Sequence, residues 1–546
     1  MSKKITITLL SICFIFQLHA QVAPNRYRVF FVDKNNNNYT INAPEQFLSE
    51  KAINRRLNQG IEIRENDLPV SKLYVDSLKS LGLTILNQSK WMNSAVIYST
   101  DQELIDTLDQ IGFIKSLKKL YPESIPPKTY SKTACSEYYT ESDNSLSYGE
   151  SGTQISMLNG HILHQNGYMG QGITIAVIDA GFYNSDILPA FDSLFVNNQV
   201  LDTYDFVAGD SEVYSDNSHG MKVLSIIAGN IPGQLIGTAP KANFLLLRSE
   251  DVNSEYSIEE DNWVSAAEYA DSAGTDIINT SLGYTEFDDP SQNYTYSTMD
   301  GNSTFISRAA DIAASKGILV VVSAGNLGDD EWKYISAPAD ADSVLTVGAV
   351  DAFAGYVSFS SQGPTFDGRI KPNVAAMGYQ TVIQDISGQI TKGNGTSFSA
   401  PIISGLAACL WQALPDLTNM EIISLIEQSA HHFSTPDYEL GYGIPDFAKA
   451  ANLTSIPFSL DSDFEIDIFP NPFSDNFKIY ISNIHNYTTI ELFNVLQQKV
   501  YHKQIYTPKT TELLQINNIN NLPPGIYILK VSSGNSSLQK RVSKID

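Results

Sequence analysis

The longest patterned part of the chain runs from about residue 155 to 455 and alternates short apolar runs with helix-length amphipathic stretches. The apolar runs are rich in Ile, Val and Leu, as expected for strands buried on both faces. The clearest are residues 173–178, 276–279, 318–322 and 344–350. Strands that alternate with helices favour a mostly parallel sheet covered by helices on both sides. We therefore predict an α/β domain of three layers.

A different pattern precedes this domain. Strand-like runs fall at residues 26–32, 83–86, 93–98 and 114–120. Between the first two, apolar residues such as Tyr74 and Leu78 recur at helical spacing and stop at Gly82. Thr100 and Glu103 have the spacing of a capping box and open a second helix. The order β-α-β-β-α-β predicts a small α+β unit of split βαβ, or ferredoxin-like, topology.

Two further segments complete the organisation. Residues 121–151 are rich in Pro, Ser, Thr and Glu and lack periodicity, which predicts an exposed linker open to proteolysis. After Leu453 the chain changes to short strands separated by Asn, Pro and Gly turns, at 477–481, 489–493 and 526–531. This pattern predicts an independent all-β sandwich module.

The first twenty residues have the pattern of a secretory signal. Lys3 and Lys4 precede an apolar stretch that ends near Leu18, and Ala20 precedes the expected cut. The stretch is short for a membrane span, and no later apolar run reaches about 18 residues, so we expect no integral membrane span. Cys13 lies inside the stretch and leaves a lipid-anchored start as an alternative.

Net charge and cysteine content exclude some kinds of partner and some kinds of fold. The chain has 35 Lys and Arg against 60 Asp and Glu, a net charge of −25. This surface repels phosphate backbones and anionic lipid, which argues against nucleic-acid or membrane-surface partners. Only Cys135 and Cys409 follow the signal, enough for one disulfide but not for a disulfide framework. Cys409 shares a helical spacing with Leu406 and Leu410, which favours a free buried thiol.

Asp179 and His219 are the first candidates for chemistry. Asp179 directly follows the strand 173–178, at the end of a parallel strand where open α/β sheets place ligands. His219 begins a helix-like run that ends at Gly229. Taken alone, each residue could equally cap a turn or a helix.

The segment from Asn394 to Pro401, Asn-Gly-Thr-Ser-Phe-Ser-Ala-Pro, carries the strongest signal. Gly395 permits a tight backbone, and Ser397 enters the first turn of a helix whose N–H groups suit a developing oxyanion. A helix cap explains one hydroxyl but not the order of Gly, Ser and Pro together. Asn326 follows the strand 318–322, where its amide suits an oxyanion donor, although a turn Asn is the alternative.

Taken together, the segments around Asp179, His219, Asn326 and Ser397 resemble the subtilisin-like serine protease family, peptidase S8, in the same Asp, His, Ser order. The resemblance implies a secreted serine endopeptidase that forms an acyl-enzyme. Asp179, His219 and Ser397 would be the triad, and Asn326 with the Ser397 N–H the oxyanion hole. The substrate-binding residues that it implies, for a polypeptide substrate, are Ser281, Leu282, Gly283, Ser323, Ala324 and Gly325.

Two departures from the family pattern keep a rival interpretation open. Ala180 stands where the family has Ser or Thr, and Met221 where it has Thr. A non-enzymatic surface-binding protein built on a decayed protease is therefore the alternative. An esterase of the α/β-hydrolase type is disfavoured, because no Gly-x-Ser-x-Gly frames a serine and the triad order differs.

Metal binding is not predicted from the residues themselves. The resemblance allows structural calcium. However, the acidic groups at 288–289, at 329–330, and at Asp340 and Asp342 lack a defined ligand loop. We therefore interpret them as solvated surface and assign no metal ligand.

The flanking units extend the resemblance. The split βαβ unit resembles the propeptide of such proteases, which assists folding and acts as their own inhibitor. The C-terminal module, with Phe469-Pro-Asn-Pro472, resembles the type IX secretion sorting domain. That implies the secretion machinery as a partner and a secreted or cell-surface product, with a carbohydrate or adhesion module as the alternative. The predicted divisions are signal peptide 1–20, propeptide 21–130, linker 131–154, catalytic domain 155–455 and sorting domain 460–546.

Overall fold

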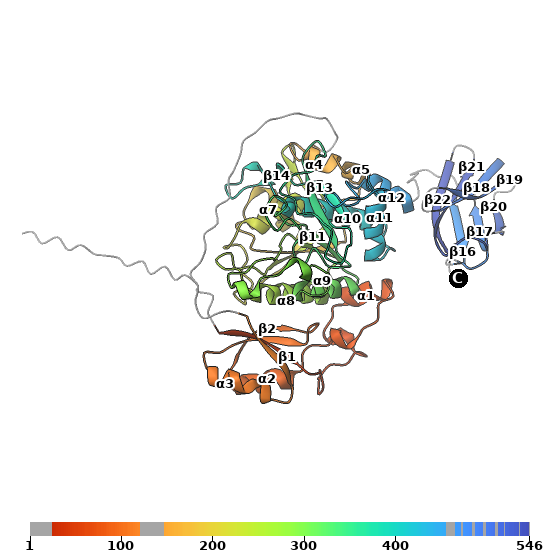
Figure 1. Ribbon diagram of the computed structural model, residues 1–546. Helices are drawn as coiled ribbons and strands as arrows, with labels where there is room; N and C mark the ends of the chain where they lie inside the picture. Colours follow the sequence, from red (N-terminus) through yellow and green to blue (C-terminus); the bar gives the residue numbers. More distant parts are fainter. Residues whose placement is uncertain are drawn as a thin grey trace, which may run out of the picture.

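The computed structural model describes residues 25–120, 147–454 and 465–544, the last without residues 471–472, 483–485, 495–497, 508–510, 518 and 534–535. The first range forms an α+β unit, the second a large α/β domain and the third a β module (Figure 1). The predicted α/β class with a mostly parallel sheet is confirmed. Within the described residues, no helix is long and apolar enough to cross a membrane.

The α/β domain is organised around seven strands in the order β13-β12-β11-β10-β5-β9-β6, and every pair is parallel. The strands are β5 Thr174–Asp179, β6 Val200–Asp205, β9 Asn243–Arg248, β10 Ile277–Thr280, β11 Leu319–Ser323, β12 Leu345–Val350 and β13 Val374–Met377. The four apolar runs predicted from the sequence become β5, β10, β11 and β12, with boundaries shifted by a residue or two.

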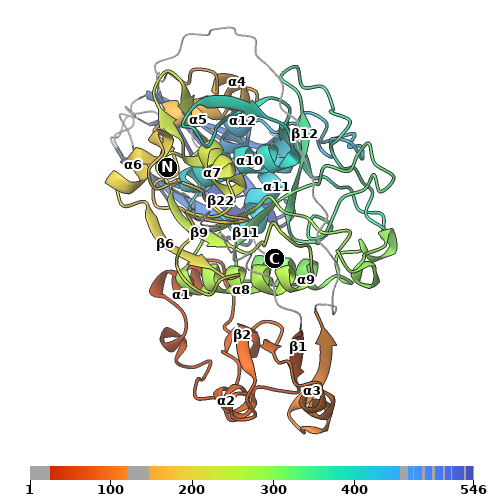
Figure 2. The same ribbon diagram turned by 90° about the vertical axis from the view of Figure 1, so that its left-hand side faces the viewer.

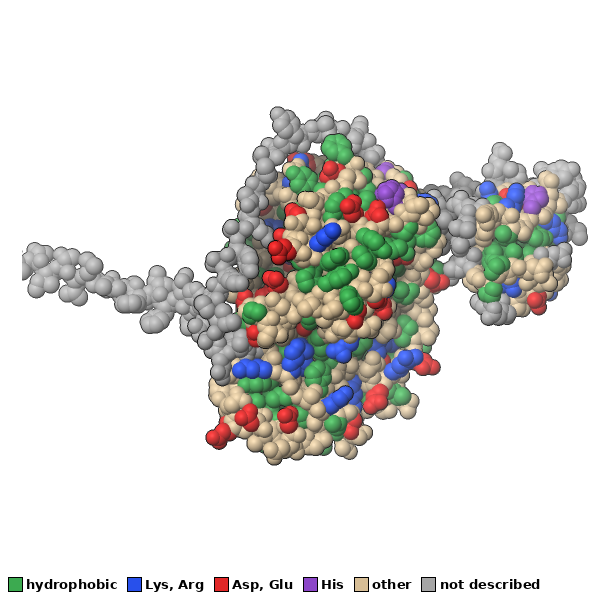
Figure 3. All heavy atoms as spheres, viewed as in Figure 1, with side chains coloured by type: hydrophobic (Ala, Val, Ile, Leu, Met, Phe, Trp, Pro, Cys, Tyr) green, Lys and Arg blue, Asp and Glu red, His purple; other side chains and the backbone are tan. Residues whose placement is uncertain are grey.

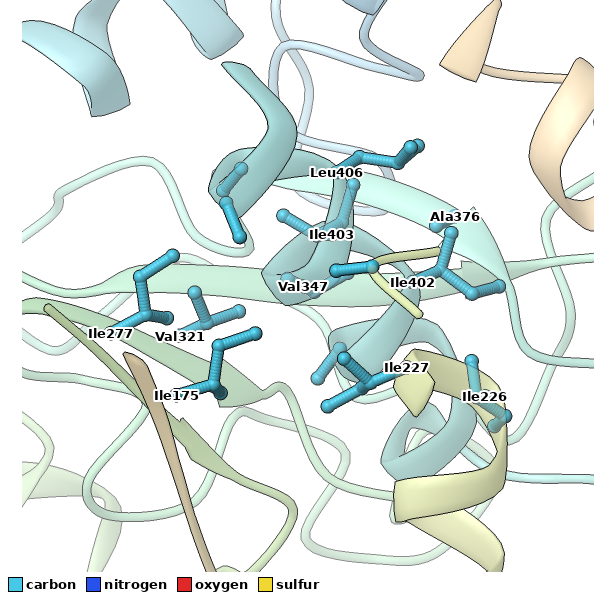
Figure 4. Close-up of a cluster of buried hydrophobic side chains, with 14 of the residues drawn as sticks. Ile175, Ile226, Ile227, Ile277, Val321, Val347, Ala376, Ile402, Ile403 and Leu406 are labelled. Carbon is cyan, nitrogen blue, oxygen red and sulfur yellow. The ribbon is translucent and has the colours of Figure 1, made fainter. Parts of the chain in front are cut away.

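Helices cover both faces of this sheet. Successive residues of each strand point to opposite sides, so an apolar strand offers side chains to the helices on both faces. Ile175 and Val177 of β5 pack against α7 (His219–Ala228) and α10 (Thr396–Ala413). Ala176 and Ile178 pack on the other face against α8 (Ile258–Ala273) and α9 (Phe305–Ser315). Figure 4 shows the first face, where strand and helix side chains meet: Ile175, Ile277, Val321, Val347, Ala376, Ile226, Ile227, Ile402, Ile403 and Leu406.

Shorter elements complete the domain. They are α4 Gly152–Ser156, α5 Gly160–Gln165, α6 Asp192–Val196, β7 Asn230–Ile231, β8 Leu235–Ile236, β14 Thr381–Gln384, β15 Ile390–Gly393, α11 Asn419–Ser429 and α12 Phe447–Thr454. Cys409 is a free, buried thiol in α10. Cys135 lies outside the described residues.

The N-terminal unit has the predicted ferredoxin-like arrangement of four antiparallel strands, in the order β2-β3-β1-β4. Its elements are β1 Arg26–Phe31, α2 Lys72–Ser80, β2 Thr84–Ser89, β3 Ser94–Tyr98, α3 Gln102–Thr107 and β4 Ile114–Lys119. An additional helix, α1 (Glu50–Asn58), begins after Ser49, whose side chain accepts a hydrogen bond from the Ala52 N–H. The unit lies against α8 and α9 (Figure 2).

Buried ion pairs join this unit to α8. Arg55 and Arg56 of α1 both contact the carboxylate of Asp271, at 2.5 and 2.9 Å. Arg28 of β1 contacts Asp261 in the same way. Figure 3 shows basic side chains gathered along this junction on the visible face. Because a buried charge is costly without a partner, these pairs depend on the two units staying together.

The β module consists of two sheets, β16-β17-β20 and β19-β18-β21-β22, with antiparallel pairing throughout. Its strands are β16 Glu465–Phe469, β17 Phe477–Ser482, β18 Asn486–Asn494, β19 Lys499–Thr507, β20 Thr511–Ile516, β21 Gly525–Ser533 and β22 Ser536–Lys544. Apolar residues from both sheets, including Phe477, Ile490 and Leu529, form one buried cluster. The expectation of an all-β module is confirmed.

Candidate active site

Asp179 and His219 meet at the carboxyl end of β5. Asp179 is the last residue of that strand and is fully buried, and His219 is the first residue of α7. His219 Nδ1 lies 2.6 Å from Asp179 Oδ1. The His219 backbone N–H donates to Asn217 Oδ1 at 2.7 Å, which holds the start of the helix in place. The pair is therefore placed for His219 Nδ1–H to donate to the carboxylate.

Arg248 fixes the backbone that follows Asp179. It ends β9, the parallel neighbour of β5, and its Nε donates to the Ala180 carbonyl at 3.2 Å. Its Nη1 binds Asp205 at 2.6 Å and lies 3.1 Å from Asp216. The sequence offered no local signal for this role, because the contact joins neighbouring strands through a side chain at the end of an ordinary apolar run.

Ser397 is the second residue of α10 and lies beside Ser281. Its Oγ donates to the Ser281 carbonyl at 3.2 Å. The helix starts after Gly395, which has a φ of +146°, a backbone angle that glycine adopts more readily than other residues. In the described part of the chain, the hydrogen bonds of Ser397 include none to His219.

Asn326 faces the same place from the loop after β11. Its Oδ1 accepts hydrogen bonds from the Thr396 N–H at 2.8 Å and from Thr396 Oγ1 at 3.1 Å. Thr396 Oγ1 in turn accepts from the Gly325 N–H at 3.1 Å. Because the amide oxygen is occupied by Thr396, the NH2 group is the part of Asn326 that can donate to a ligand.

A cavity of about 320 Å³ collects most of the expected site residues. Its lining includes Ser397, Asn326, Gly325, Ser323 and the segment from Ser281 to Gly283. Ala324 is fully buried in the core on the α8 and α9 side of the sheet, and it is not among the lining residues.

The remaining lining residues were not predicted from the sequence as part of the site: Glu255, Thr285, Glu286, Phe287, Asp288, Leu327 and Ser336. Ser336 is buried, and its Oγ has no hydrogen-bond partner among the described residues. A Cβ on Gly283 would lie 2.2 Å from this Oγ, so a larger residue there would require the Ser336 side chain to move. No motif frames these residues, because the cavity forms between segments far apart in sequence.

The two departures from the family pattern, Ala180 and Met221, both lie close to the pair of Asp179 and His219 in sequence. Asp179 Oδ2 is buried and has no hydrogen-bond partner among the described residues. Ala180 follows Asp179 and has no hydroxyl to offer, and its N–H donates to Oδ1 instead, at 2.8 Å. Met221 is fully buried in the core between α7 and the sheet.

The interpretation of Asp340 as solvated surface is wrong. Its side chain is fully buried and accepts hydrogen bonds from Ser307 Oγ at 2.5 Å and the Gly301 N–H at 2.8 Å. Burial raises the pKa of Asp340 to about 6. The sequence pattern of alternating Asp and Ala around it gave no sign that this loop packs inward.

Comparison with known proteins assigns all three parts. The model described as Subtilase family matches residues 170–443, the Peptidase S8 propeptide domain of Bacteroidota matches residues 26–135, and the secretion system C-terminal sorting domain matches residues 467–544. A sorting domain of this kind belongs to proteins that are secreted or held at the cell surface.

Two subtilisins agree with the match to the Subtilase family. Subtilisin DY of Bacillus licheniformis is 30% identical over 300 residues, 54% of this chain and 97% of that protein. Subtilisin E of Bacillus subtilis is 28% identical over 382 residues, 69% of this chain and 85% of that protein. A solved structure of MycP1 with its N-terminal propeptide removed is 26% identical and covers 56% of this chain and 98% of its own, with a TM-score of 0.44.

Proposed function

Since the chain belongs to the subtilase family and is a serine-type endopeptidase, we propose that Asp179, His219 and Ser397 are its catalytic triad. The observations that carry the assignment are the 2.6 Å contact between Asp179 Oδ1 and His219 Nδ1 and the stacking of the His219 ring on Phe398, the residue after Ser397, at a centroid distance of 6.2 Å. This contact fixes the imidazole tautomer, so that Nε2 is the nitrogen free to take a proton.

The proposed reaction begins with the Ser397 hydroxyl. Its Oγ leaves the Ser281 carbonyl, passes its proton to His219 Nε2 and attacks the peptide carbonyl carbon. Asp179 stabilises the imidazolium that results. The oxyanion accepts hydrogen bonds from Asn326 Nδ2 and the Ser397 N–H, both preorganised by Thr396 and the start of α10.

Collapse of the tetrahedral intermediate breaks the peptide C–N bond. His219 gives its proton to the leaving amine, and the acyl group stays on Ser397 Oγ. A water molecule then attacks the ester carbon and loses its proton to His219. As the bond between that carbon and Ser397 Oγ breaks, His219 returns the proton to Oγ and the acid product leaves. The reaction needs no cofactor. We propose that Ser281 to Gly283 holds the substrate backbone, while Ser323 and Gly325 line the pocket for the side chain before the scissile bond.

The triad tolerates Ala180 and Met221 in this proposal. All groups that would touch the reacting atoms are present, and Arg248 holds the backbone after Asp179 from the neighbouring strand. Two observations on the described residues favour a decayed, binding-only protein: the buried Asp179 Oδ2 has no partner there, and Ser397 Oγ donates to Ser281 rather than to His219. Neither removes the contact of Asp179 Oδ1 to His219, so hydrolysis is the function that we propose.

The N-terminal unit is proposed to inhibit the enzyme until it is cut away. Its last described residue, Leu120, is buried against Tyr256 and Ile258, and the Leu120 carbonyl accepts a hydrogen bond from Gln292. Tyr256 is the neighbour of Glu255, which lines the cavity. The chain therefore leaves the unit next to the substrate cavity. We further propose that the β module engages the secretion machinery.

The experiment for this proposal is steady-state hydrolysis of a peptide by Ser397→Ala, His219→Ala and the double variant. Residues that act as a unit are strongly non-additive, so we expect each single variant to lose about 10⁶ in kcat and the double variant to lose little more. Normal hydrolysis by folded Ser397→Ala protein would overturn the triad assignment.

A further inference from the structure

Glu250, Glu255 and Glu259 form a compact group of carboxylates behind the substrate cavity. Glu250 follows β9, Glu255 lies in the next loop, and Glu259 is in the first turn of α8. One carboxylate oxygen from each lies within 4.8 Å of one from each of the others. We refer to these three residues as the glutamate triad.

The glutamate triad lacks a positive partner among the described residues, although two of its members are buried. Glu259 is 2% exposed and Glu250 is 8% exposed, whereas Glu255 is partly exposed. The ion pairs formed within the described ranges include none to any of the three. Buried charges in proteins are normally paired or coordinate a metal, so this arrangement is incomplete as it stands.

The hydrogen bonds of the group leave acceptor capacity unused. Tyr284 Oη and Ser249 Oγ both donate to Glu250 Oε1, at 2.5 and 2.8 Å. The Asp251 N–H donates to Glu259 Oε1 at 3.2 Å. Glu259 Oε2 is buried without a partner in the part of the chain that the structure describes. An almost fully buried carboxylate oxygen therefore lacks a donor within this group.

Burial also changes the pKa values of the three carboxyl groups. Burial raises the pKa of Glu250 to about 7, and the hydrogen bonds from Tyr284 and Ser249 oppose the shift. Burial also raises the pKa of Glu255 and of Glu259 well above the usual range, and repulsion within the triad adds to both shifts.

We propose that Glu250, Glu255 and Glu259 bind one divalent cation, with Ca²⁺ the best match. Ca²⁺ binds oxygen ligands at about 2.3–2.6 Å, so two ligands on opposite sides of one ion stand roughly 5 Å apart. The spacing of at most 4.8 Å fits such a shell. Mg²⁺ binds at about 2.0–2.1 Å and demands stricter octahedral geometry, so the loop position of Glu255 suits it less well.

The site is linked to the substrate cavity through Glu255. Glu255 lines that cavity together with Ser397 and Asn326. Its N–H donates to Asp288 Oδ2 at 3.1 Å, and the Asp288 N–H donates back to the Glu255 carbonyl at 2.8 Å. A cation bound by the glutamate triad thus orders the part of the cavity wall that Glu255 forms. Removal of the cation is therefore expected to raise KM rather than to lower kcat. Only this link to KM rests on the proposed function.

The test measures cation binding directly and uses the full-length Ser397→Ala chain, which cannot degrade itself. Tb³⁺ luminescence excited through tyrosine reports the site, because the Tyr284 hydroxyl contacts Glu250. The chain is stripped with EDTA, loaded with Tb³⁺ and titrated with CaCl2 or MgCl2. We expect Ca²⁺ to displace Tb³⁺ at lower concentration than Mg²⁺.

Glu259→Gln is the decisive variant, and Glu286→Gln is its matched control, an exposed acid that also lines the cavity. We expect Glu259→Gln to weaken Tb³⁺ and Ca²⁺ binding on the order of 10–100-fold and Glu286→Gln to leave both unchanged. Glu255→Gln repeats the test if Glu259→Gln does not fold. Unchanged Tb³⁺ and Ca²⁺ binding in folded Glu259→Gln and Glu255→Gln proteins would overturn the proposal.

A second measurement separates this cation from a cationic side chain of the substrate. In the chain with Ser397 intact, EDTA should raise KM for neutral and basic peptides alike, and CaCl2 should reverse the effect. Insensitivity to EDTA, with Glu255→Gln losing only cleavage of peptides that contain Lys or Arg, would overturn the metal site in favour of a substrate-binding role. Failure of the catalytic assignment would leave the Tb³⁺ result unaffected.

Discussion

Ser397 and Ser281 are joined by two reciprocal hydrogen bonds: Ser397 Oγ donates to the Ser281 carbonyl at 3.2 Å, and Ser281 Oγ donates to the Ser397 carbonyl at 3.0 Å. Pro401 explains the second. A residue four positions after Ser397 would normally donate its N–H to the Ser397 carbonyl, but proline has none. The carbonyl is thereby left for Ser281, which ties the start of α10 to the segment after β10.

This explanation predicts coupling between Ser281 and Pro401. Ser281→Ala should leave the Ser397 carbonyl without a donor and lower the free energy of unfolding by about 1–3 kcal/mol. Pro401→Ala restores an N–H that can donate to the Ser397 carbonyl. Ser281→Ala should therefore lower the free energy of unfolding clearly less in Pro401→Ala protein. Urea unfolding of both variants and their combination, in inactive Ser397→Ala protein, measures the coupling. Strict additivity would show that Pro401 is unrelated to the Ser281 contact.

Asn326 is predicted to act on the transition state. Asn326→Ala should lower kcat by roughly 10²–10³ with little change in KM, because the amide donor is needed mainly when the oxyanion forms. Asn326→Asp is the matched variant: it keeps an oxygen for Thr396 but removes the NH2 group, and a similar loss is expected. If the effect were confined to KM, Asn326 would serve only to bind substrate.

The junction between the N-terminal unit and α8 should depend on Asp271. Arg55, Arg56 and Lys90 all contact its buried carboxylate. Asp271→Asn leaves Arg55 and Lys90 without their carboxylate partner and Arg56 with Asp67 alone, and it should weaken the association by about 3–5 kcal/mol. Asp276→Asn is the control, because its partner Lys51 is 41% exposed and such pairs contribute about 1 kcal/mol or less. Thermal unfolding of the full chain compares the two.

The Asp271 carboxylate also makes the stability of this junction depend on pH, and the direction of the dependence follows from its pKa shift. The three cations hold the pKa of Asp271 well below its usual range, against the effect of burial. The assembled state therefore binds fewer protons at Asp271 than the separated or unfolded state. This contribution is complete above the ordinary Asp pKa of about 4 and is lost as pH falls through the lower, native value. A difference between wild type and Asp271→Asn that stayed constant down to about pH 2 would contradict this account.

Much of the fold could be predicted because its signals are local. The apolar runs of β5, β10, β11 and β12 and the order of elements in the N-terminal unit need only a short window of sequence. Three strands of the sheet were not predicted: β6 is an edge strand with mixed burial, the Val-Ala-Ala-Met of β13 is short, and the Leu-rich run of β9 lacks the β-branched residues typical of strands. Helix α1 is weakly apolar, and it contacts the rest of the protein through Arg55 and Arg56.

The site could be predicted only in part, because only some of its residues lie in short sequence motifs. Short motifs frame Asp179, His219 and Ser397, so each is visible without the fold. No such motif frames Ser336 or Arg248. Nothing in the sequence shows that Glu259 and Asp271 of α8 are buried, since acidic residues on a helix usually face solvent. They are buried because other parts of the chain, including the N-terminal unit, cover the helix.

The flanking units should be separable by deletion. Removal of residues 460–546 should leave a protein that folds and cleaves peptide but fails to reach the cell exterior in its native host. Removal of residues 21–130 should instead impair folding, because it exposes the acidic, buried face of α8. Activity of purified protein and its distribution between cells and medium measure both effects. If the C-terminal deletion abolished catalysis in folded protein but left export untouched, the module would belong to the enzyme.

The central claim is that Ser397 is a nucleophile activated by His219. A fluorophosphonate reacts covalently with such a serine, and peptide mapping by mass spectrometry locates the adduct. We expect a single phosphonylated residue, Ser397, in the active protein and no adduct in folded His219→Ala protein. Absence of labelling in folded, processed wild-type protein, or labelling of another serine, would contradict the claim.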